Sequence, residues 1–454
     1  MKVLLISPNP ERLPDPVFPI GAAYIAAALK AAGIGCRCLD LCFEENVAGA
    51  LGQAVREQAP DLIALSLRNV DNVSWPHAVS YLPFYKEVVT LLRSLSQAPI
   101  VLGGSGYTLL PQELLNYLKA DFGIAGEGEA ALVGLAEHLG GQAPLEQLAD
   151  GRILRPGDFP APDLDRLPRP DRGAFDSALY LRRGGMGSLQ TKRGCPFNCV
   201  YCTYPLIEGR QVRVRDPKLI CDEIEALLEQ GLTTLFIVDN AFNFPMNHAE
   251  AVCREIIRRG LVFRWSCYAN PAFITSELVD LMQRAGCTSL EFGTDAGCDG
   301  MLAGMGKNFS AAQILETSRI CHASGMPFCH SLLLGGPGET MQTVERTIAA
   351  IDRTQPTAVI CMVGIRIFPR TRLAAIAQQE GRIRPGEDFL QTRFYLADAI
   401  AAPILDHLQS LARSHPTWIF PGLQININTS LQQKLRRFGV KGPLWEYMKV
   451  GRQR

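Results

Sequence analysis

The sequence predicts an α/β protein in which a doubly wound parallel sheet precedes an incomplete parallel barrel. Residues 1–140 alternate short apolar runs with helical stretches, a pattern typical of a doubly wound sheet. A second alternation of strand and helix begins at Ser188, and its six units fit an incomplete parallel barrel better than a flat sheet. Between the two, residues 141–187 lose this periodicity and are rich in proline, glycine, aspartate and arginine, which predicts a linker.

Five short apolar runs are the predicted strands of the first domain, and a helix is expected over residues 21–32. Several of these runs end in small or turn-forming residues, such as Gly103-Gly104 and Gly126-Glu127. Ligands of doubly wound sheets bind at the carboxyl ends of the strands, so these turns are candidate binding sites. The runs cover residues 3–6, 36–41, 62–67, 100–103 and 122–125.

The predicted barrel spans residues 188–384, and a small, mostly helical cap region is expected over residues 385–454. Trp418, Trp445 and Tyr447 give this region the bulk to close the barrel mouth. A small core or a dimer contact is the alternative use of these aromatic residues. The six predicted barrel strands cover residues 188–192, 234–239, 263–269, 289–293, 327–334 and 358–368.

The charge balance excludes a protein that acts mainly through a strong electrostatic field. Forty-five basic residues offset 45 acidic ones in a chain of 454 residues, so no global field gathers nucleic acid or an anionic membrane surface. Hydrophobic residues make up 47% of the chain, which is enough apolar material for two cores. The expected partners are therefore small molecules and not nucleic acid.

The sequence contains no stretch typical of export or of membrane insertion. The apolar run at residues 3–6 is too short for the core of a signal peptide, and no apolar stretch approaches the roughly 20 residues that span a bilayer. Fourteen cysteines without an export signal argue against a disulfide scaffold, because the cytosol keeps thiols reduced. We expect a cytoplasmic protein.

Cys195, Cys199 and Cys202 form a CxxxCxxC pattern directly after the first predicted barrel strand. Iron–sulfur clusters used for electron transfer are normally held by four cysteines, so three thiolates leave one iron open to a substrate or cofactor. A zinc site or a chance grouping is the alternative. Zinc would need a fourth ligand nearby, whereas Cys221 and Cys253 stand singly on predicted helices. The pattern therefore favours a catalytic cluster.

The same pattern, with the aromatic Tyr201 just before the last cysteine, resembles the signature of the radical S-adenosylmethionine (SAM) superfamily. The resemblance implies that Cys195, Cys199 and Cys202 hold a [4Fe-4S] cluster whose open iron chelates the amino and carboxylate groups of SAM. It also implies that an electron donor such as flavodoxin or ferredoxin reduces the cluster, which then cleaves SAM to a 5′-deoxyadenosyl radical. The protein positions and shields that radical.

The resemblance extends along the predicted barrel. Glu291-Phe292-Gly293 matches a fourth-strand segment that family members place near SAM, so Glu291 and Gly293 are expected SAM-binding residues. Gly335 and Gly336 belong to a glycine-rich motif after the fifth strand and would let the backbone approach the same ligand. Taken alone, such a glycine–proline–glycine segment is usually only a turn.

The first 140 residues resemble the cobalamin-binding domain of one large radical SAM subgroup. The match rests on the order and spacing of residues 18–21, Gly103-Gly104 and Gly126-Glu127. The resemblance implies that these glycines and Glu127 border a bound corrin. A DxHxxG segment, which would supply an axial histidine to cobalt, does not occur, and this absence is common within the subgroup.

Arg68 and Asn69, in the loop after the third strand, then become candidates for contacting the face of the corrin. An arginine there would hinder water from coordinating cobalt. The alternative is that Arg68 pairs with Asp71 or caps a helix. The polar and aromatic stretch that continues to Trp75 is expected to line the space between corrin and barrel, with an ordinary surface loop as the alternative.

Together these resemblances imply a cobalamin-dependent radical SAM enzyme, with methyl transfer to an unactivated carbon of a small molecule as the expected reaction. One SAM would methylate the cobalamin, and a second would supply the radical that activates the acceptor. A dehydration, rearrangement or cyclisation, in which the front domain does not supply methylcobalamin, is the second hypothesis. A non-catalytic cobalamin or iron–sulfur sensor is the third.

His330, on the predicted fifth barrel strand, is the expected catalytic side chain after the cysteines. A lone histidine in an apolar strand is more often a hydrogen-bonded core residue, which is the alternative. Asp239-Asn240 follows the second strand, where the family often has an acidic pair and where a helix N-cap is equally expected. Tyr268, Arg366 and Arg370, on predicted barrel strands or their exits, are candidates for contacting the substrate, with a place in the core or at the rim as the equal alternative.

Overall fold

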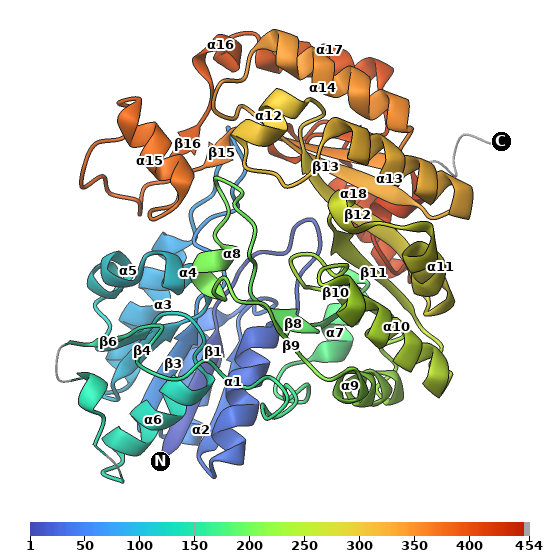
Figure 1. Ribbon diagram of the computed structural model, residues 1–454. Coiled ribbons are helices and arrows are strands. Elements are labelled where there is room, and N and C mark those ends of the chain that lie inside the picture. The colour runs from blue at the N-terminus through green and yellow to red at the C-terminus, as the bar shows by residue number, and fades with distance from the viewer. Residues whose placement is uncertain (143, 149–150, 449–454) are drawn as a thin grey trace.

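The computed structural model describes residues 1–142, 144–148 and 151–448, which form two α/β domains (Figure 1). The predicted α/β class is confirmed, with one large parallel sheet in each domain. The first sheet has the strand order β2-β1-β3-β4-β5-β6. Its strands are β1 (Lys2–Ser7), β2 (Gly35–Asp40), β3 (Leu62–Ser66), β4 (Ile100–Gly103), β5 (Phe122–Ile124) and β6 (Ile153–Leu154).

Helices cover both faces of the first sheet, as the alternation of side chains along β1 requires. Val3 and Leu5 pack in the core beneath α1 and α6, whereas Leu4 and Ile6 pack in the core beneath α2, α3 and α5. Both cores are apolar, so the central strands β1, β3 and β4 consist mainly of hydrophobic residues. The helices are α1 (Ile20–Ala31), α2 (Val47–Gln58), α3 (Leu82–Leu95), α4 (Ser105–Leu109), α5 (Pro111–Leu118) and α6 (Glu129–Leu139).

Part of the segment expected to be a linker belongs to the first domain. Within residues 141–187, β6 pairs with β5 in parallel and adds a sixth strand to the sheet. Farther along, α7 (Ser177–Gly184) brings Tyr180 into edge contact with Phe18 at the start of α1. Irregular sequence rich in proline hides a strand as short as β6, because two residues carry no periodicity.

The second domain is an incomplete parallel barrel with the strand order β17-β14-β13-β12-β11-β10-β7. Its strands are β7 (Gly187–Leu189), β10 (Thr234–Ile237), β11 (Arg264–Ala269), β12 (Cys287–Asp295), β13 (Phe328–Leu334), β14 (Ala358–Val363) and β17 (Trp418–Ile419). The outer helices are α9 (Pro217–Glu229), α10 (Met246–Arg259), α11 (Ser276–Arg284), α13 (Ala311–Ser324), α14 (Met341–Thr354) and α17 (Ile404–Ser414).

Side chains alternate between the helices and the barrel interior along each strand of this sheet. On β11, Trp265, Cys267 and Ala269 pack in the core under the outer helices. Ser266 and Tyr268 must then face the interior. The same alternation assigns the interior-facing residues of the neighbouring strands, and they line the space in which a ligand of the barrel would lie.

Two features of the barrel depart from the predicted elements. The single strand expected over residues 358–368 is broken at Gly364, where φ is +72°, into β14 and β15 (Ile365–Arg366). β15 then pairs with β16 (Phe394–Tyr395). The expected helical cap also contributes β17, which pairs with β14. The cap still contains α16 (Asp398–Ala401), α17, α18 (Thr429–Arg437) and the short helix η4 (Leu444–Tyr447).

The C-terminal segment closes the end of the barrel opposite to the one expected. Glu446 accepts hydrogen bonds from Ser289 Oγ (2.5 Å) and Thr288 Oγ1 (3.2 Å), both at the start of β12. Arg264 at the start of β11 donates to the same carboxylate at 3.3 Å. η4 therefore forms a floor at the amino ends of the strands and does not cover the mouth at their carboxyl ends. The last six residues of the expected cap, 449–454, lie outside the described residues.

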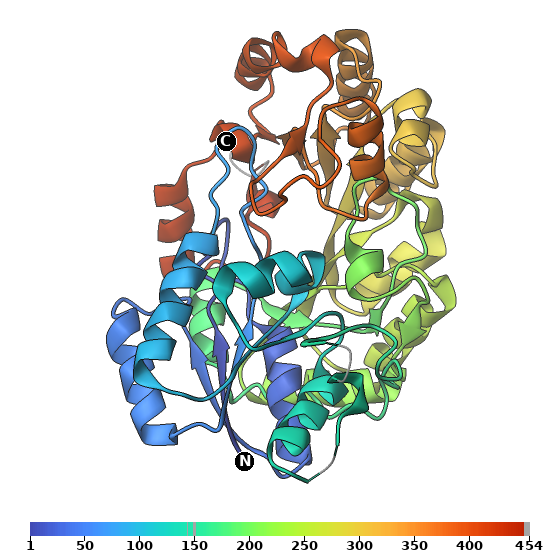
Figure 2. The same cartoon turned by 90° about the vertical axis from the view of Figure 1, so that its left-hand side faces the viewer.

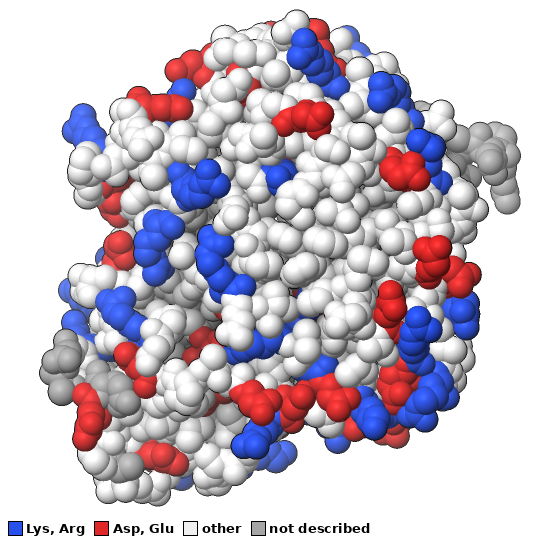
Figure 3. Space-filling model, in the orientation of Figure 1, with Lys and Arg blue, Asp and Glu red and all other residues white. Residues whose placement is uncertain are grey.

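No helix in the described part of the chain is long and apolar enough to cross a membrane. Lys and Arg are interspersed with Asp and Glu on the face shown in Figure 3, in agreement with the balanced charge of the sequence.

Candidate active site

The cysteine pattern lies in a loop between β8 (Lys192–Arg193) and β9 (Arg213–Val214), which pair as a short antiparallel ribbon. Cys195, Cys199 and Cys202 all belong to this loop, and the short helix α8 (Tyr204–Ile207) follows it. Val200 in the loop donates a backbone hydrogen bond to Met305 at 3.0 Å. The segment around Met305 thus supports the cysteine loop from the far side of the barrel mouth.

Glycine is needed where that supporting segment meets the loop. Gly306 has φ +73°, and a Cβ atom there would collide with the carbonyl group of Asn198. Gly336 stands behind it, because a Cβ on Gly336 would lie 2.6 Å from Met305 Sδ. The role of Gly336 in this structure is therefore close packing behind the cysteine loop.

A hydrogen-bonded cluster of Lys307, Asp295 and Tyr201 lies beside the cysteines. Lys307 Nζ and Tyr201 Oη donate to Asp295 Oδ2 at 2.8 and 2.7 Å. Burial raises the pKa of the Cys199 thiol, and the Lys307 ammonium lowers it again. Burial likewise raises the pKa of Cys202, to about 12. Buried thiols of this kind become thiolates when a metal supplies the compensating positive charge.

Three cysteine thiols in one loop are the donor set expected for a cubane cluster with one open iron. Within the described residues, no three histidine, cysteine, aspartate or glutamate side chains converge on one metal position. In a [4Fe-4S] cluster each cysteine binds a different iron, so three thiolates spread around one loop fit the cluster.

Asp239 and Asn240 hold the cysteine ribbon to the barrel. Asp239 is fully buried and accepts hydrogen bonds from the Thr191 amide (2.8 Å) and from Lys192 Nζ (2.9 Å). Asn240 Nδ2 donates to the Gly194 carbonyl at 2.8 Å. Neither residue caps a helix, and both fix the start of the loop that carries the cysteines.

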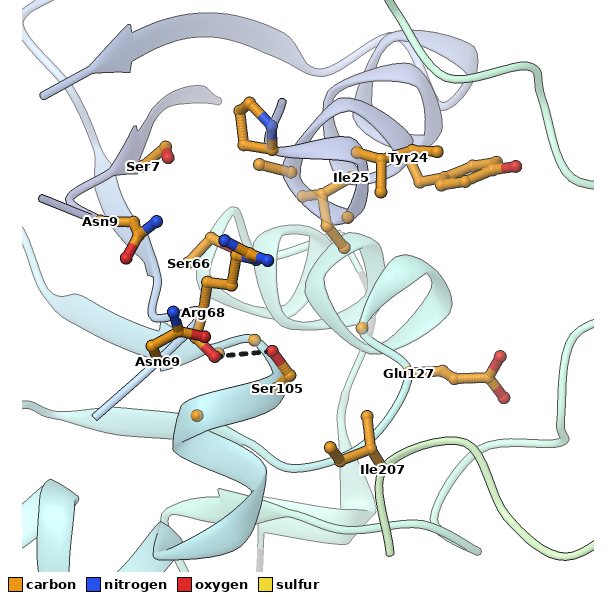
Figure 4. Close-up of a pocket in the computed structure, with 18 of the residues that line it drawn as sticks. Ser7, Asn9, Tyr24, Ile25, Ser66, Arg68, Asn69, Ser105, Glu127 and Ile207 are labelled. Atoms are coloured by element: carbon orange, nitrogen blue, oxygen red, sulfur yellow. Dashed lines mark hydrogen bonds between the residues drawn. The ribbon is translucent and has the colours of Figure 1, made fainter. Parts of the chain in front are cut away.

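A cavity of about 510 Å³ lies between the two domains, at the carboxyl ends of β1, β3, β4 and β5 (Figure 4). Its far wall is formed by Thr203, Tyr204 and Ile207, which directly follow Cys202. The cavity therefore joins the ligand edge of the first sheet to the cysteine loop. All six residues that the resemblance assigned to the corrin line it: Arg68, Asn69, Gly103, Gly104, Gly126 and Glu127.

The floor of this cavity depends on close packing between two loops. Gly104 has φ +96°, and a Cβ there would lie 2.6 Å from the Leu67 carbonyl oxygen. Ser105 Oγ donates to the Arg68 carbonyl at 2.8 Å, as the dashed line in Figure 4 shows. The Gly106 amide donates to Leu67. These contacts hold the loop after β3 against the start of α4.

The lining of this cavity fits a corrin without an imidazole ligand. No histidine is among the described residues that line it. Asn9 Oδ1 faces the cavity, is buried, and has no hydrogen-bond partner in the described part of the chain. Figure 4 shows Asn9, Ser66 and Arg68 grouped along one side. Small backbone turns and the unpaired amide oxygen of Asn9 suit the amide-rich rim of a corrin.

Arg68 does not pair with Asp71, the alternative that the sequence left open. Asp71 forms a buried ion pair with Arg366 of the barrel at 2.8 Å, and Thr392 Oγ1 donates to it at 3.1 Å. Among the described residues, Arg68 takes part in no ion pair, so its guanidinium remains available to a ligand of the cavity.

Glu127 joins the domains in addition to lining the cavity. Its carboxylate pairs with Arg193 at 2.6 Å and with Arg213 at 2.8 Å, both on the cysteine ribbon. Arg193 also pairs with Glu129 at 2.7 Å. The ligand edge of the first domain is thus held to the cysteine ribbon by charge-assisted hydrogen bonds.

In the barrel interior, Glu291 of β12 faces Ser331 of β13, whose Oγ donates to the carboxylate at 2.8 Å. Gly293 follows on the same strand face, nearer the cysteine loop, and is exposed. Burial raises the pKa of Glu291, while Ser331 and Trp445 lower it. Both expected SAM-binding residues of β12 therefore lie in the interior.

His330 is not brought to this site, which corrects the expected catalytic role. It is completely buried and lies on the helix-facing side of β13, between Thr294 and Ser318. Its Nδ1 is 2.7 Å from Thr294 Oγ1, and its ring packs against Phe292 and Phe328. Burial lowers the pKa of His330 to about 3. Neighbouring positions on a strand face opposite sides, so His330 faces the helices while Ser331 faces the interior. His330 is therefore a hydrogen-bonded core histidine.

The glycine turn after β13 is occupied by its own glutamate. Glu339 accepts hydrogen bonds from the backbone amides of Gly335 and Gly336. A Cβ on Gly335 would lie 2.6 Å from Leu396. Packing alone accounts for glycine at both positions in this structure.

Lys307 and Arg193 are functional neighbours that the sequence did not reveal. Lys307 is about 100 positions from the cysteines and lies in no motif, so only folding shows that it joins them. Arg193 immediately precedes Gly194-Cys195, and its position in the motif was the one available signal.

Comparison with known families assigns both domains. The Radical SAM superfamily model matches residues 189–351, and the B12 binding domain model matches residues 11–136. The chain belongs to the radical SAM superfamily, in the subgroup with a B12-binding domain. Its cofactors are a [4Fe-4S] cluster, SAM and cobalamin. The family assignment supports the cluster and corrin fits described above.

Several relatives of this radical SAM protein are methyltransferases, and the similarity covers most of both chains. The chain is 27% identical over 450 residues to the tryptophan 2-C-methyltransferase of Streptomyces laurentii, covering 83% of this chain and 75% of that one. It is 23% identical to an uncharacterized methyltransferase, PH0819, of Pyrococcus horikoshii, covering 81% and 82%. The protein is an enzyme of the B12-dependent radical SAM methyltransferase class.

The fold also matches a solved structure over nearly the whole chain. The radical SAM methyltransferase TsrM from Kitasatospora setae, solved with cobalamin and a [4Fe-4S] cluster bound, superimposes with a TM-score of 0.88. Sequence identity is 22%, and the match covers 99% of this chain and 98% of that one. At this identity the likeness establishes the common fold.

Proposed function

We propose that the methyl acceptor is a small molecule that enters the barrel interior from the corrin cavity and is methylated at carbon. The observation that carries this proposal is the shared cavity between the domains. One space is bordered by the carboxyl ends of the first sheet and by residues 203–207, directly after Cys202. Groups bound on either side of it act on the same molecule.

The chain's own residues bind, orient and shield in this reaction. When bound, cobalamin supplies a methyl carrier, and the cluster with SAM supplies a 5′-deoxyadenosyl radical. Tyr204 and Ile207 line the corrin cavity directly after the cysteine loop. Trp445 and Glu446 close the far end of the barrel, which keeps water away from reactive species in the interior.

Tryptophan is the first acceptor to test. The relative with 27% identity is named for methylation of tryptophan at C2. The barrel interior here presents the aromatic pair Phe236 and Tyr268, with ring centroids 5.0 Å apart in edge contact. An aromatic acceptor would extend this cluster. A rearrangement or cyclisation without cobalamin is not favoured, because the corrin cavity keeps every predicted lining residue.

We further propose that a flavodoxin or ferredoxin reduces the cluster in a reducing compartment, the cytoplasm. All fourteen cysteines are free thiols, and the cluster loop needs its three thiols unoxidised. Anaerobic reduction of the reconstituted cluster by purified flavodoxin, followed as SAM cleavage, tests the donor. If SAM is cleaved with a chemical reductant but with neither flavodoxin nor ferredoxin, neither protein is the electron donor.

The deciding experiment measures metal and corrin content after anaerobic reconstitution with iron, sulfide and hydroxocobalamin. We expect about four irons and one cobalt per chain. The variant Cys195→Ala/Cys199→Ala/Cys202→Ala should lose the iron and keep the cobalt, because corrin contacts come chiefly from the first domain. Iron without cobalt in the wild type would remove methyl transfer. Mass spectrometry of reactions with methyl-labelled SAM and tryptophan then tests the acceptor.

A further inference from the structure

Glu291 is a carboxylate in the barrel interior that lacks a cationic partner. It lies on the interior face of β12, since Leu290 and Phe292 on either side pack under the outer helices. Within residues 1–142, 144–148 and 151–448, the one side-chain hydrogen bond that it accepts with good geometry comes from Ser331 Oγ, at 2.8 Å. Among the described residues, no lysine, arginine or histidine forms an ion pair with Glu291. Burial of an unpaired carboxylate is costly unless a ligand supplies the missing charge.

Glu291 is half-buried, and the fully buried acidic residues elsewhere in the described part of the chain are mostly paired with cations. Asp239 pairs with Lys192, and Asp295 pairs with Lys307. Glu339, which has no cation, is instead held by two backbone amides. Glu291 has neither arrangement. Further buried pairs join Asp71 to Arg366, Glu129 to Arg193, and Glu223 to Arg172 and Arg215.

The space beside Glu291 is accessible and partly aromatic. Tyr268 on the neighbouring strand is paired with Glu291 in register, and its side chain is 38% exposed although it faces the barrel interior. Gly293 is exposed on the same face of β12. The charge of Glu291 raises the pKa of Tyr268 well above its usual value, and Arg68 of the corrin cavity acts on the same hydroxyl. The exposure of Tyr268 and Gly293 therefore leaves accessible space beside Glu291.

The interior ends just beneath Glu291. Trp445 of η4 packs on Cys329 and Ala358, the interior-facing residues that stand in register with Glu291. Trp445 Nε1 is buried and has no hydrogen-bond partner of good geometry in the described part of the chain. It lies close enough to Glu291 to lower the pKa of that carboxyl. Glu291 therefore stands at the closed end of an accessible chamber.

We propose, resting on the methyltransferase function above, that Glu291 binds the ammonium group of the methyl acceptor. The acceptor class is then a primary amine attached to an aromatic or apolar group that lies along Phe236 and Tyr268. Glu291 is a binding residue for the acceptor and takes no part in the transfer of the methyl group itself.

The position of Glu291 along β12 separates this role from binding of SAM. Asp295 at the end of the strand contacts Tyr201 and Lys307 beside the cysteines. Glu291 is four residues earlier, or about 13 Å deeper at about 3.3 Å per residue. A cluster held by Cys195, Cys199 and Cys202 would bind the charged amino and carboxylate groups of SAM near the mouth. The deeper anion is left for the acceptor.

The test compares three indole probes with the reconstituted holoenzyme: tryptophan, tryptamine and indole-3-propionate. Only the last lacks the amine. Calorimetry measures probe binding to the wild type, to Glu291→Gln, and to the control Glu345→Gln, which changes an exposed glutamate on α14. Glutamine keeps the shape and can still accept from Ser331, so the variant should fold. The affinity of SAM and the iron and cobalt contents are measured in parallel.

We expect the wild type and the control to bind both amines at least about tenfold more tightly than indole-3-propionate, as for a hydrogen bond to a charged group. Glu291→Gln should lose this preference and keep its SAM affinity. The proposal is overturned if Glu291→Gln weakens SAM as much as the amines, if the desamino probe binds equally well, or if no amine binds. Loss of cobalt in the wild type would instead refute the proposed methyl transfer.

Discussion

At the scale of single residues, chemistry within one loop was predictable, and chemistry assembled across the fold was not. Cys195, Cys199 and Cys202 stand within eight positions, so their spacing alone indicates a cluster with an open iron. Lys307 and Asp295 reach the same loop from the far side of the barrel. Lys307 lowers the pKa of Cys199 only because folding brings the end of β12 and the segment after it beside the cysteine loop. No local sequence pattern shows this.

His330 shows how one position along a strand decides function. Its neighbour Ser331 faces the interior and contacts Glu291, whereas His330 faces α13. Burial lowers the pKa of His330 to about 3, below the value near 6.5 expected for the unfolded chain. The unfolded chain therefore takes up a proton first as the pH falls, and folding stability is lost from about pH 6.5 downward.

We predict that His330→Asn keeps full iron content and SAM cleavage but lowers the free energy of unfolding at pH 7 by about 1–3 kcal/mol. Between pH 6.5 and 4.5 the wild type should lose up to about 1.4 kcal/mol per pH unit relative to this variant, because asparagine does not titrate. Urea unfolding at both pH values measures the difference. Loss of SAM cleavage in a folded, iron-loaded variant would restore the catalytic role.

At the scale of elements, glycine positions determine how closely loops approach one another. The turn after β4 was predicted as a ligand-binding edge, and all of its expected residues line the corrin cavity. The reason for glycine there is now specific. Gly104 has φ +96° and lies against the backbone of Leu67, so any side chain would push the loops apart.

Gly104→Ala should therefore weaken cobalamin binding by at least about tenfold, since the left-handed backbone and the displaced loop together cost about 1–3 kcal/mol. Cobalt content after reconstitution and dialysis measures the effect. Iron content should stay unchanged because the cysteine loop belongs to the other domain. Gly300→Ala is a matched control, as no atom lies within 4 Å of a Cβ there. Equal cobalt retention by both variants would contradict this account of the turn.

Short strands were the elements that sequence patterns missed. β6 and β17 have two residues each and join the edges of sheets built from more distant segments. The strand expected over residues 358–368 ended early, because Gly364 turns the chain where Trp75 packs against it. A side chain from the first domain thus sets the end of a strand in the second.

At the scale of the whole molecule, buried ion pairs join the two domains around the shared cavity. Arg193 binds Glu127 and Glu129 beside the cysteine loop. Arg436 of α18 binds Asp15 of the first domain at 2.5 Å. On the opposite side, the loop after β3 rises to the barrel, as Figure 2 shows, and Asp71 pairs there with Arg366. Such pairs give the interface a defined geometry more than they give it stability.

A double-mutant cycle at Asp71 and Arg366 tests this connection. Removing either partner leaves a buried charge, so Asp71→Ala and Arg366→Ala should each lower the free energy of unfolding by about 3–5 kcal/mol. The double variant should cost less than the sum, with a coupling of about 0.5–3 kcal/mol. Denaturant unfolding supplies all three values. Strict additivity would show that the pair does not hold the domains together.

The sequence by itself determined the two α/β domains, the cysteine motif and the edge of the first sheet that binds a ligand. These are local properties, because periodicity, turn residues and ligand spacing act within about 15 positions of one another. Only the tertiary structure decided that His330 faces the core, that Glu291 stands unpaired in the interior, and that Trp445 closes the floor beneath it. Those facts depend on strand faces and on contacts between segments that are separated by 12 to 40 positions for His330 and Glu291, and by more than 80 positions for Trp445, and only folding brings these segments together.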